Sequence, residues 1–395
     1  MKPFIPSDFA AFVGIDWADR KHDICCQPTG GERELRQIQH TPQAIEDWAQ
    51  SLLERFAGQP VAVCLELTKG PLVYALMKYP HLVLIPVNPA GLAQYRKTFT
   101  PSGAKDDPTD AELALDLVQR HFDRFQPLTP DSPEMRTLQE LVVYRRKCVG
   151  DRMRISNRII SALKNYYPQV LDWFDDRNTR VFCDFLIKWP SLSQVQRSRT
   201  STLEHFFSTH NVRRRNVIER RIEGIRSARP LTDDPAALRA NQLIVETQVL
   251  QLKLMIQIIK QIDGEIAELC GALEDYELFT SLPAAGPTYA PRLLAAFGEN
   301  RDRFQSARHV QQCSGVAPVL ERSGKKSWVH WRYACSTFMR QSFVEWSGET
   351  VRYSFWAKAF YEYQTERQIT PRHLACTGFQ VDQNLVPLLA ESREV

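Results

Sequence analysis

Short apolar runs and amphipathic stretches alternate through the first third of the chain. Apolar runs between turn residues predict buried strands, and apolar residues spaced three and four apart predict helices. The expected strands cover 11–16, 22–28, 34–40, 61–66 and 82–87, and the expected helices cover 41–56, 71–78, 90–99 and 107–121. Strands that alternate with helices after an initial hairpin are typical of an α/β domain with one mixed sheet. We therefore expect such a domain over 9–125.

Two long helical patterns dominate the middle of the chain, at 133–167 and 235–273. Between them, 168–235 is predicted to be a helical insert interrupted by prolines. In the second long pattern, apolar residues recur every seven positions in two rows: Val245, Leu252, Ile259 and Ile266 form one row, and Met255, Ile262 and Leu269 form the other. This repeat suits a coiled-coil seam, and it also suits a core helix of a bundle. In both cases we expect 133–273 to form a long helical arm, and arms of this kind commonly dimerise.

The last third of the chain, 274–395, is expected to be mainly helical. A turn with Pro and Gly at 282–288 lies between two predicted helices, and such a turn lets backbone N–H groups approach a nucleic-acid phosphate. The polar and basic segment 317–328 contains Gly324 and is predicted to be a loop. It is the best candidate for a reactive loop outside the first domain.

The composition is that of an ordinary globular protein, because 43% of the 395 residues are hydrophobic and 24% are charged. No apolar run approaches the ~20 residues that a membrane-spanning helix needs, so we expect no membrane partner. The segment 1–8 lacks a signal-peptide layout, and the nine cysteines form no Cys-x-x-Cys pair. These features predict a cytoplasmic protein with reduced, mostly buried thiols.

The net charge is only +4, but the basic residues are unevenly distributed. One cluster contains Arg145, Arg146, Lys147, Arg152, Arg154, Arg158 and Lys164, and another contains Arg213, Arg214, Arg215, Arg220, Arg221, Arg226 and Arg229. Basic stripes on helices are the usual sign of binding to phosphate backbones. A solvated helix face with acidic partners nearby has the same composition, so each cluster alone leaves both interpretations open.

Four carboxylates in the first domain are the main candidates for chemistry. Asp16 and Glu66 end two predicted strands, and Asp107 and Asp110 lie three positions apart at the start of a predicted helix. Taken singly, Asp16 suits a turn, and the other two aspartates suit the start of a helix, whose dipole favours acids. Taken together, four negative charges at one point repel one another unless cations bind between them. Two Mg²⁺ ions would meet this need and would clamp the attacking and leaving oxygens of a phosphodiester.

Short motifs follow one another along the chain in a specific order. The chain contains Gly14-Ile15-Asp16, then Glu66-Leu67-Thr68, then Asn88-Pro89, then Lys105-Asp106-Asp107-Pro108-Thr109-Asp110-Ala111. This series resembles the signature of the DEDD transposases of the insertion-sequence-one-ten family, and 282–287 and 313–318 resemble two C-terminal segments of that family. The resemblance covers nearly the whole chain, with the helical arm between its parts. It implies an RNase H-like, RuvC-type first domain and a mainly α C-terminal transposase domain over 274–395.

The resemblance also implies an activity and a set of partners. The family's recombinases excise and insert a mobile element, and a serine attacks the DNA phosphate to give a covalent phosphoserine beside Mg²⁺-binding acids. The family's Ser-Gly motif matches Ser323-Gly324, so Ser323 is the expected nucleophile; Ser327 is the second choice, and Ser336 and Ser342 are more distant ones. The implied partners are donor and target DNA, a non-coding bridge RNA that pairs with both, and further copies of the chain in a dimer of dimers. The implied nucleic-acid contacts are the two arm clusters together with Lys325, Lys326, Arg332 and Arg340.

The chain departs from the family pattern at several positions. Lys69 precedes Gly70, Ala284 and Ala285 replace the usual Gly and Ile of the C-terminal turn, and 328–336 lacks the usual Lys-x-Gly. These departures bear on the C-terminal DNA contacts more than on the acids. Three other activities are compatible with the sequence: a site-specific DNA invertase with the same acids and serine, a RuvC-type nuclease that uses water, and a nucleic-acid-binding protein without catalysis.

Overall fold

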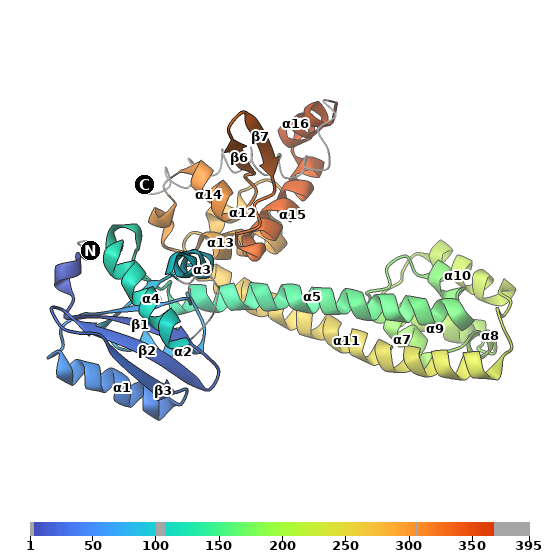
Figure 1. Ribbon diagram of the computed structural model, residues 1–395. Helices are drawn as coiled ribbons and strands as arrows, with labels where there is room; N and C mark the ends of the chain where they lie inside the picture. The colour runs from blue at the N-terminus through green and yellow to red at the C-terminus, as the bar shows by residue number, and fades with distance from the viewer. Residues whose placement is uncertain (1–3, 100–106, 305, 367–395) are drawn as a thin grey trace. The chain divides into compact units, whose positions relative to one another are not determined.

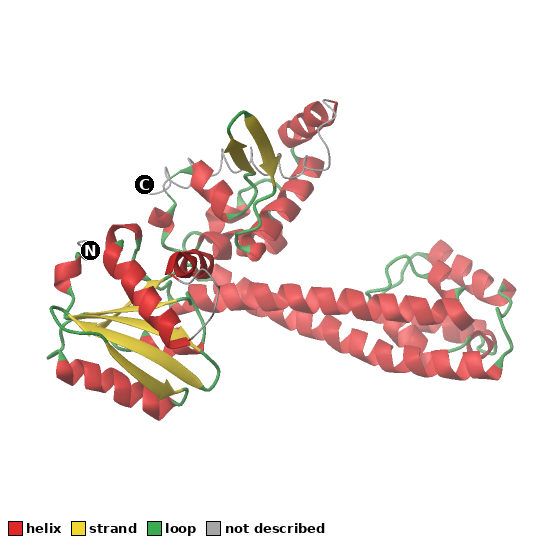
Figure 2. Cartoon of the chain, viewed as in Figure 1, coloured by secondary structure: helices red, strands yellow, loops and turns green. Residues whose placement is uncertain are grey.

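The computed structural model describes residues 4–99, 107–304 and 306–366 (Figure 1). Contacts within the chain divide it into two compact units, Met1–Pro130 and Asp131–Val395. The first unit holds a five-stranded sheet with helices on both faces, whereas the second is mainly helical (Figure 2). No helix of the described residues is long and apolar enough to cross a membrane.

One mixed sheet organises the first unit. Its strands are β1 (Ala11–Trp17), β2 (Lys21–Pro28), β3 (Glu34–Gln39), β4 (Val61–Leu65) and β5 (Leu82–Pro86), in the spatial order β3-β2-β1-β4-β5. β1, β2 and β3 pair antiparallel, while β1, β4 and β5 pair parallel. All five predicted strands are confirmed, each within one residue of its expected ends. A central β1 therefore has a parallel neighbour on one side and an antiparallel neighbour on the other.

Four α-helices cover the two faces of this sheet: α1 (Pro42–Arg55), α2 (Pro71–Leu76), α3 (Pro89–Phe99) and α4 (Asp107–Arg120). α1 and α2 pack on the face that carries Val13 and Ile15, and α3 and α4 pack on the face that carries Phe12. The expected start of α1 is confirmed, because the Thr41 side chain accepts a hydrogen bond from the Ala44 amide over 3.2 Å.

Two long antiparallel helices, α5 (Pro133–Tyr166) and α11 (Pro235–Gly271), form the arm of the second unit (Figure 1). Their direction follows from their contacts, because Asn165 bonds Asn241 near one end and Arg145 pairs with Asp263 near the other. The insert connects the end of α5 to the start of α11, and its five short helices pack against these two ends. They are α6 (Val170–Trp173), α7 (Arg180–Lys188), α8 (Leu192–Gln196), α9 (Thr200–Thr209) and α10 (Arg215–Ser227).

The first apolar row predicted on α11 is buried throughout: Val245, Leu252, Ile259 and Ile266. In the second row Ile262 is buried, whereas Met255 and Leu269 are half-buried. Val249, outside both rows, is fully buried. The reason is that α11 packs against the insert in its first half and against the C-terminal helices in its second half, so its buried stripe changes direction.

The C-terminal part of the second unit contains α12 (Tyr276–Thr280), α13 (Gly286–Phe297), α14 (Ala307–Cys313), α15 (Thr337–Tyr353) and α16 (Phe355–Glu366). Phe279, Phe297, Phe343 and Trp346 form one core with Leu138 and Ile262 at the base of the arm. The predicted turn between two helices at 282–288 is confirmed. Ala284 adopts a φ of 58° there, in the left-handed region that favours glycine.

The prediction of a loop at 317–328 was wrong, because most of this segment forms two strands. β6 (Val319–Ser323) and β7 (Lys326–His330) form an antiparallel hairpin there. Gly324 stands first in a two-residue turn and has a φ of 58°, which a type II′ hairpin turn requires. The strands escaped notice because almost all their residues are exposed and no apolar run marks them.

The thiol prediction is confirmed for the residues that the structure describes. All eight described cysteines are free, and six of them are buried.

Candidate active site

Asp16 and Glu66 lie side by side at one end of the sheet. β1 and β4 are parallel, and their last paired residues are Ile15 and Leu65. Asp16 and Glu66 are the next residue of each strand, so they continue the same register. Residues in register on neighbouring parallel strands share a face and lie about 4.8 Å apart in the backbone. The strand ends therefore bring these two carboxylates together, and both are half-buried.

A close approach of α4 to β1 brings Asp110 to the same face. A Cβ atom at Gly14 would lie 1.9 Å from the Ala111 carbonyl oxygen, so only glycine allows α4 to pack this tightly. Gly14 and Asp16 are two residues apart in a strand and therefore face the same way. Ala111 follows Asp110 directly in α4. The helix thus covers the face of Asp16 and carries Asp110 to it.

The Asp110 carboxylate forms an ion pair with Arg96 of α3. Its Nε donates to Asp110 Oδ1 over 2.5 Å, and only 3% of Asp110 is exposed. A buried carboxylate needs a cation or hydrogen-bond donors, and Arg96 meets this need. Asp107 is the first residue of α4, and its side chain lies outside the described residues.

Asp23 is a fourth carboxylate on this face that the sequence analysis missed. It lies directly opposite Asp16 in the β1–β2 pairing, and it is 8% exposed. Gln37 of β3 donates to its Oδ1 over 2.9 Å. Asp23 lies near the start of β2, two residues before Cys25, and its burial depends on the neighbouring strands β1 and β3.

The donor set is chemically suited to Mg²⁺, because carboxylate oxygens are its preferred protein ligands. However, within 4–99, 107–304 and 306–366 no three acidic, His or Cys side chains are grouped closely enough to hold a metal ion. The Asp110 carboxylate is turned to Arg96, and the Asp107 side chain is not among those described.

A buried ion network fixes α4 in place. Asp116 accepts hydrogen bonds from Arg33 over 2.5 Å, from Tyr95 of α3 over 2.6 Å and from Arg120 over 2.7 Å. Burial alone would raise the pKa of Asp116, but the hydrogen bonds from Arg120, Tyr95 and Arg33 outweigh it and lower the pKa to about 2. Arg33 also bonds Glu112 over 2.6 Å. The network ties α4 to α3 and to the connection after β2.

Ser323 stands at the tip of the β6–β7 hairpin. It is exposed and directly precedes the Gly324 turn. Lys326 is its cross-strand partner, so the lysine side chain lies on the same face as the serine. Glu321 shares that face, and its carboxylate bonds His330 Nε2 over 2.7 Å. The Ser323 hydroxyl is thus presented to solvent beside one cation.

The other candidate serines have different surroundings. Ser336 caps α15 by accepting from the Met339 amide over 3.3 Å. Ser342 is fully buried and accepts from Arg292 Nε over 3.3 Å. Ser327 is exposed, but it lies on the opposite face of the hairpin from Ser323, with Arg322 as its partner.

The predicted basic contacts differ in their surroundings. Several have partners within the protein: Arg145 pairs with Asp263, Arg154 with Asp151, Arg215 with Glu219, and Arg340 with backbone oxygens and Cys335. Arg332 donates to the Ala317 carbonyl over 3.3 Å, and Arg146 and Arg152 are half-buried. The exposed residues include Lys147, Arg158, Arg213, Arg214, Lys325 and Lys326.

Two family models match the chain over these features. A model of DEDD transposases of the IS110 type, described as a transposase, matches residues 13–168. A model described as the transposase IS116/IS110/IS902 family matches residues 276–362. The first match includes Asp16, Glu66 and Asp110, and the second includes Ser323. The protein is therefore a transposase, an enzyme class whose substrate is DNA. Within that class, the chain belongs to the IS110 family.

Three similar proteins support this assignment. A Streptomyces coelicolor protein described as the transposase of the IS117 mini-circle is 26% identical over 375 residues, which cover 90% of this chain and 87% of that protein. A Sinorhizobium fredii protein described as a transposase is 25% identical over 207 residues, 51% of this chain and 57% of that protein. A 44.8 kDa protein of the insertion element IS116 from Streptomyces clavuligerus is 25% identical over 224 residues, 56% of this chain and 55% of that protein.

Proposed function

We propose that this protein excises and inserts an insertion sequence through a covalent phosphoserine intermediate. Ser323 Oγ attacks a DNA phosphorus, a new O–P bond forms, the bond from phosphorus to one sugar oxygen breaks, and that oxygen leaves as a hydroxyl. The phosphoester keeps the bond energy for the rejoining step. The observation that carries the proposal is the position of Ser323: an exposed hydroxyl at a hairpin tip, with Lys326 across from it to meet phosphate charge.

We infer that the first unit has the RNase H-like, RuvC-type fold. The strand order β3-β2-β1-β4-β5, with β2 antiparallel and β4 parallel to β1, supports this inference. Transposases of the DEDD type typically depend on a divalent metal. Asp16, Glu66, Asp107 and Asp110 would hold Mg²⁺, as two ions, on the face that α4 covers. Bound there, Mg²⁺ would neutralise charge on the phosphate and stabilise the leaving oxygen. Asp16 and Glu66 are in register on neighbouring strands, and this supports their role as shared ligands.

A guide RNA would supply sequence recognition in this scheme. The protein would then contact nucleic acid mainly through phosphates, and the exposed Lys147, Arg158, Arg213 and Arg214 on the arm and insert suit that task. The non-coding bridge RNA would pair with donor and target DNA.

The arm would join copies of the chain into a dimer of dimers. α11 exposes Leu243, Leu250 and Leu254, which are 50%, 59% and 56% exposed. Their spacing of seven and four puts them on one stripe of the helix, away from the buried row. A continuous apolar stripe on a helix surface suits pairing with the same stripe of another copy.

An excision assay tests the proposed function. The DNA that surrounds the coding sequence is placed on a plasmid, the protein is expressed with it, and the rejoined plasmid is measured by quantitative PCR. We expect Asp16→Asn and Glu66→Gln to abolish rejoining, while Asp19→Asn, an exposed acid beyond the end of β1, leaves it unchanged. Blocking transcription of the flanking non-coding DNA, with its sequence left in place, should abolish excision until an RNA of that sequence is supplied in trans. Excision by the Asp16→Asn protein at the wild-type level would overturn the role of the acids.

A further inference from the structure

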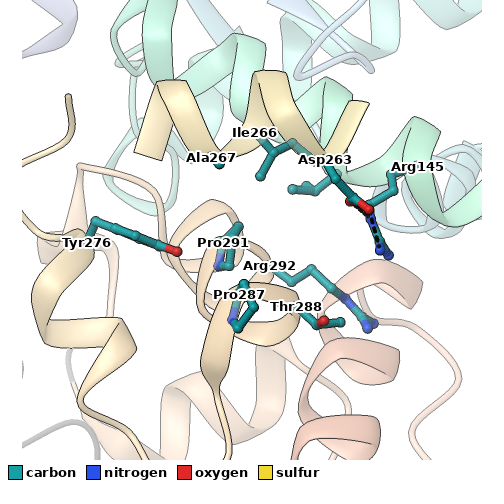
Figure 3. A pocket seen from close by; sticks show the side chains of 10 residues that line it. Arg145, Asp263, Ile266, Ala267, Tyr276, Pro287, Thr288, Pro291 and Arg292 are labelled. Atoms are coloured by element: carbon teal, nitrogen blue, oxygen red, sulfur yellow. Dashed lines mark hydrogen bonds and ion pairs between the residues drawn. The ribbon is translucent and has the colours of Figure 1, made fainter. Parts of the chain in front are cut away.

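A cavity of about 290 Å³ lies where the base of the arm meets the C-terminal helices of the second unit (Figure 3). Ile266 and Ala267 of α11 line one side, Pro287 and Pro291 of α13 line the other, and Tyr276 of α12 stands at one end. One water takes about 30 Å³ of liquid volume, so the cavity has room for a planar ring system. The proposed strand-transfer chemistry leaves this cavity without a role.

The walls of the cavity are mostly apolar. Ile266 faces two prolines, whose rings are rigid. On this apolar side of the cavity a phosphate would lose its hydration without compensation. The apolar walls favour a flat group with apolar faces, and nucleobases removed from their stack bind between apolar or aromatic side chains in this way.

Polar groups at the ends of the cavity offer both donors and acceptors. The ion pair of Arg145 with Asp263 stands at one end, and the Tyr276 hydroxyl points inward from the other (Figure 3). Pro291 has no N–H, so the Pro287 carbonyl lacks its usual donor within α13. Base edges carry donors and acceptors next to each other, so a mixed set suits a base better than a simple anion.

Arg292 gives an independent sign of a missing ligand. It lines the cavity and is only 8% exposed. Its Nη1 donates to Glu345 over 2.7 Å and its Nε donates to Ser342 over 3.3 Å. Its Nη2 is buried and has no hydrogen-bond partner among the described residues. A buried donor without a partner is costly, and a carbonyl or ring nitrogen of a bound base would satisfy it.

We propose that this cavity binds one unpaired nucleobase of the nucleic acid on which the protein acts. The inference rests on the proposed function in one respect, since it takes nucleic acid as the ligand. The base lies between Ile266 and the two prolines, and its polar edge meets Arg292. The base comes from DNA or from RNA, and both present the same chemistry to the cavity.

A pair of matched variants tests this proposal in a Ser323→Ala protein, where no covalent chemistry takes place. Ala267→Phe fills the mouth of the cavity, and Ala240→Phe places the same side chain at an exposed site elsewhere on α11. The probes are a mixed-sequence single-stranded oligonucleotide and an abasic one of equal length. We expect Ala267→Phe to weaken binding of the first about tenfold and to leave the second unchanged, while Ala240→Phe changes neither. Equal effects of Ala267→Phe on both probes would overturn the proposal.

Photocrosslinking identifies the source of the base. Oligonucleotides with 5-iodouracil, one of DNA and one of RNA, are irradiated with the same protein, and the modified residue is mapped by mass spectrometry. A crosslink at Tyr276 that is lost in Ala267→Phe supports the proposal, and the probe that gives it names the source. Crosslinks confined to residues outside the cavity with both probes would contradict it. Neither measurement needs strand cleavage, so a failure here leaves the role of Ser323 untouched, and a failure of the serine mechanism leaves this cavity testable.

Discussion

Arg96 on α3 and Asp110 on α4 form a buried ion pair, with Nε and Oδ1 2.5 Å apart. The guanidinium neutralises one of the four carboxylates proposed to bind metal. It also takes an oxygen that a metal ion would need. Arg96 therefore acts as an internal counter-ion, and metal binding at Asp110 competes with it.

The first prediction concerns this competition. Arg96→Gln removes the cation and leaves Asp110 buried without its partner. We expect the metal-free protein to lose stability and to bind Mg²⁺ or Mn²⁺ about tenfold more tightly by calorimetry, because the metal no longer displaces an arginine. Lys97→Gln, an exposed neighbour on α3, is the control and should change neither. Weaker metal binding by Arg96→Gln would mean that Arg96 supports the metal site instead.

Gly14 allows a close contact between α4 and β1. Gly14→Ala would put a Cβ 1.9 Å from the Ala111 carbonyl oxygen, so α4 must move away. We expect a loss of roughly 1–3 kcal/mol in stability, together with faster hydrogen exchange of the α4 amides.

The control for Gly14 is Gly91→Ala in α3 of the same unit, where the new Cβ meets only an ordinary contact of 3.8 Å. This variant should be neutral or slightly stabilising. Equal exchange rates in α4 for Gly14→Ala and wild type would show that the helix does not depend on this glycine.

The Asp116 network predicts a specific acid sensitivity. The pKa of Asp116 is lowered from 3.8 to about 2 by its hydrogen bonds, in spite of its burial. Because the pKa of Asp116 is lower in the folded state, its ionised carboxylate stabilises the fold. This contribution to the free energy of unfolding is complete above pH 3.8 and is lost as the pH falls towards 2. Asp116→Asn should lower stability by roughly 1–3 kcal/mol at neutral pH and should remove this part of the acid dependence. Calorimetric unfolding across this range measures both effects, and parallel pH profiles for the two proteins would refute the assignment.

His330 in the hairpin titrates in the opposite sense. Its hydrogen bond to the Trp331 carbonyl and then the one to Glu321 raise the pKa of His330 above 6.5. The folded hairpin therefore favours the charged imidazole of His330. The contribution of this charge to the stability of the hairpin is complete below pH 6.5 and is lost as the pH rises through the raised pKa. In Glu321→Gln we expect the pKa of His330, followed by NMR of the imidazole, to fall towards 6.5. An unchanged titration midpoint would leave the Trp331 carbonyl as the sole cause.

The sequence predicted the sheet and the places of Asp16 and Glu66 well, because buried strands leave apolar runs and both acids end such runs. It could not predict how Asp110 is held. The ion pair of Asp110 with Arg96 joins two different helices. Position 14 must be glycine because the backbone of Ala111, far away in the sequence, packs against it. Contacts of this kind depend on tertiary packing and leave no periodicity.

The hairpin that carries Ser323 escaped prediction for a different reason. A two-stranded hairpin with both faces exposed needs no alternation of apolar residues, so its sequence has the composition of a loop. Asp23 was missed because a carboxylate early in a strand looks like a polar strand end. Its burial becomes visible only once β1 and β3 flank it.

The most direct test of the account is the residue that becomes linked to DNA. The wild-type protein is incubated with Mg²⁺, its RNA and DNA that contains the element's end, then denatured, digested and analysed by mass spectrometry. The account predicts a nucleotide adduct on Ser323, its absence in Ser323→Ala, and its retention in Ser327→Ala. Strand cleavage by Ser323→Ala at the wild-type rate, with no protein–DNA adduct in either protein, would contradict it and would point to a water-dependent nuclease.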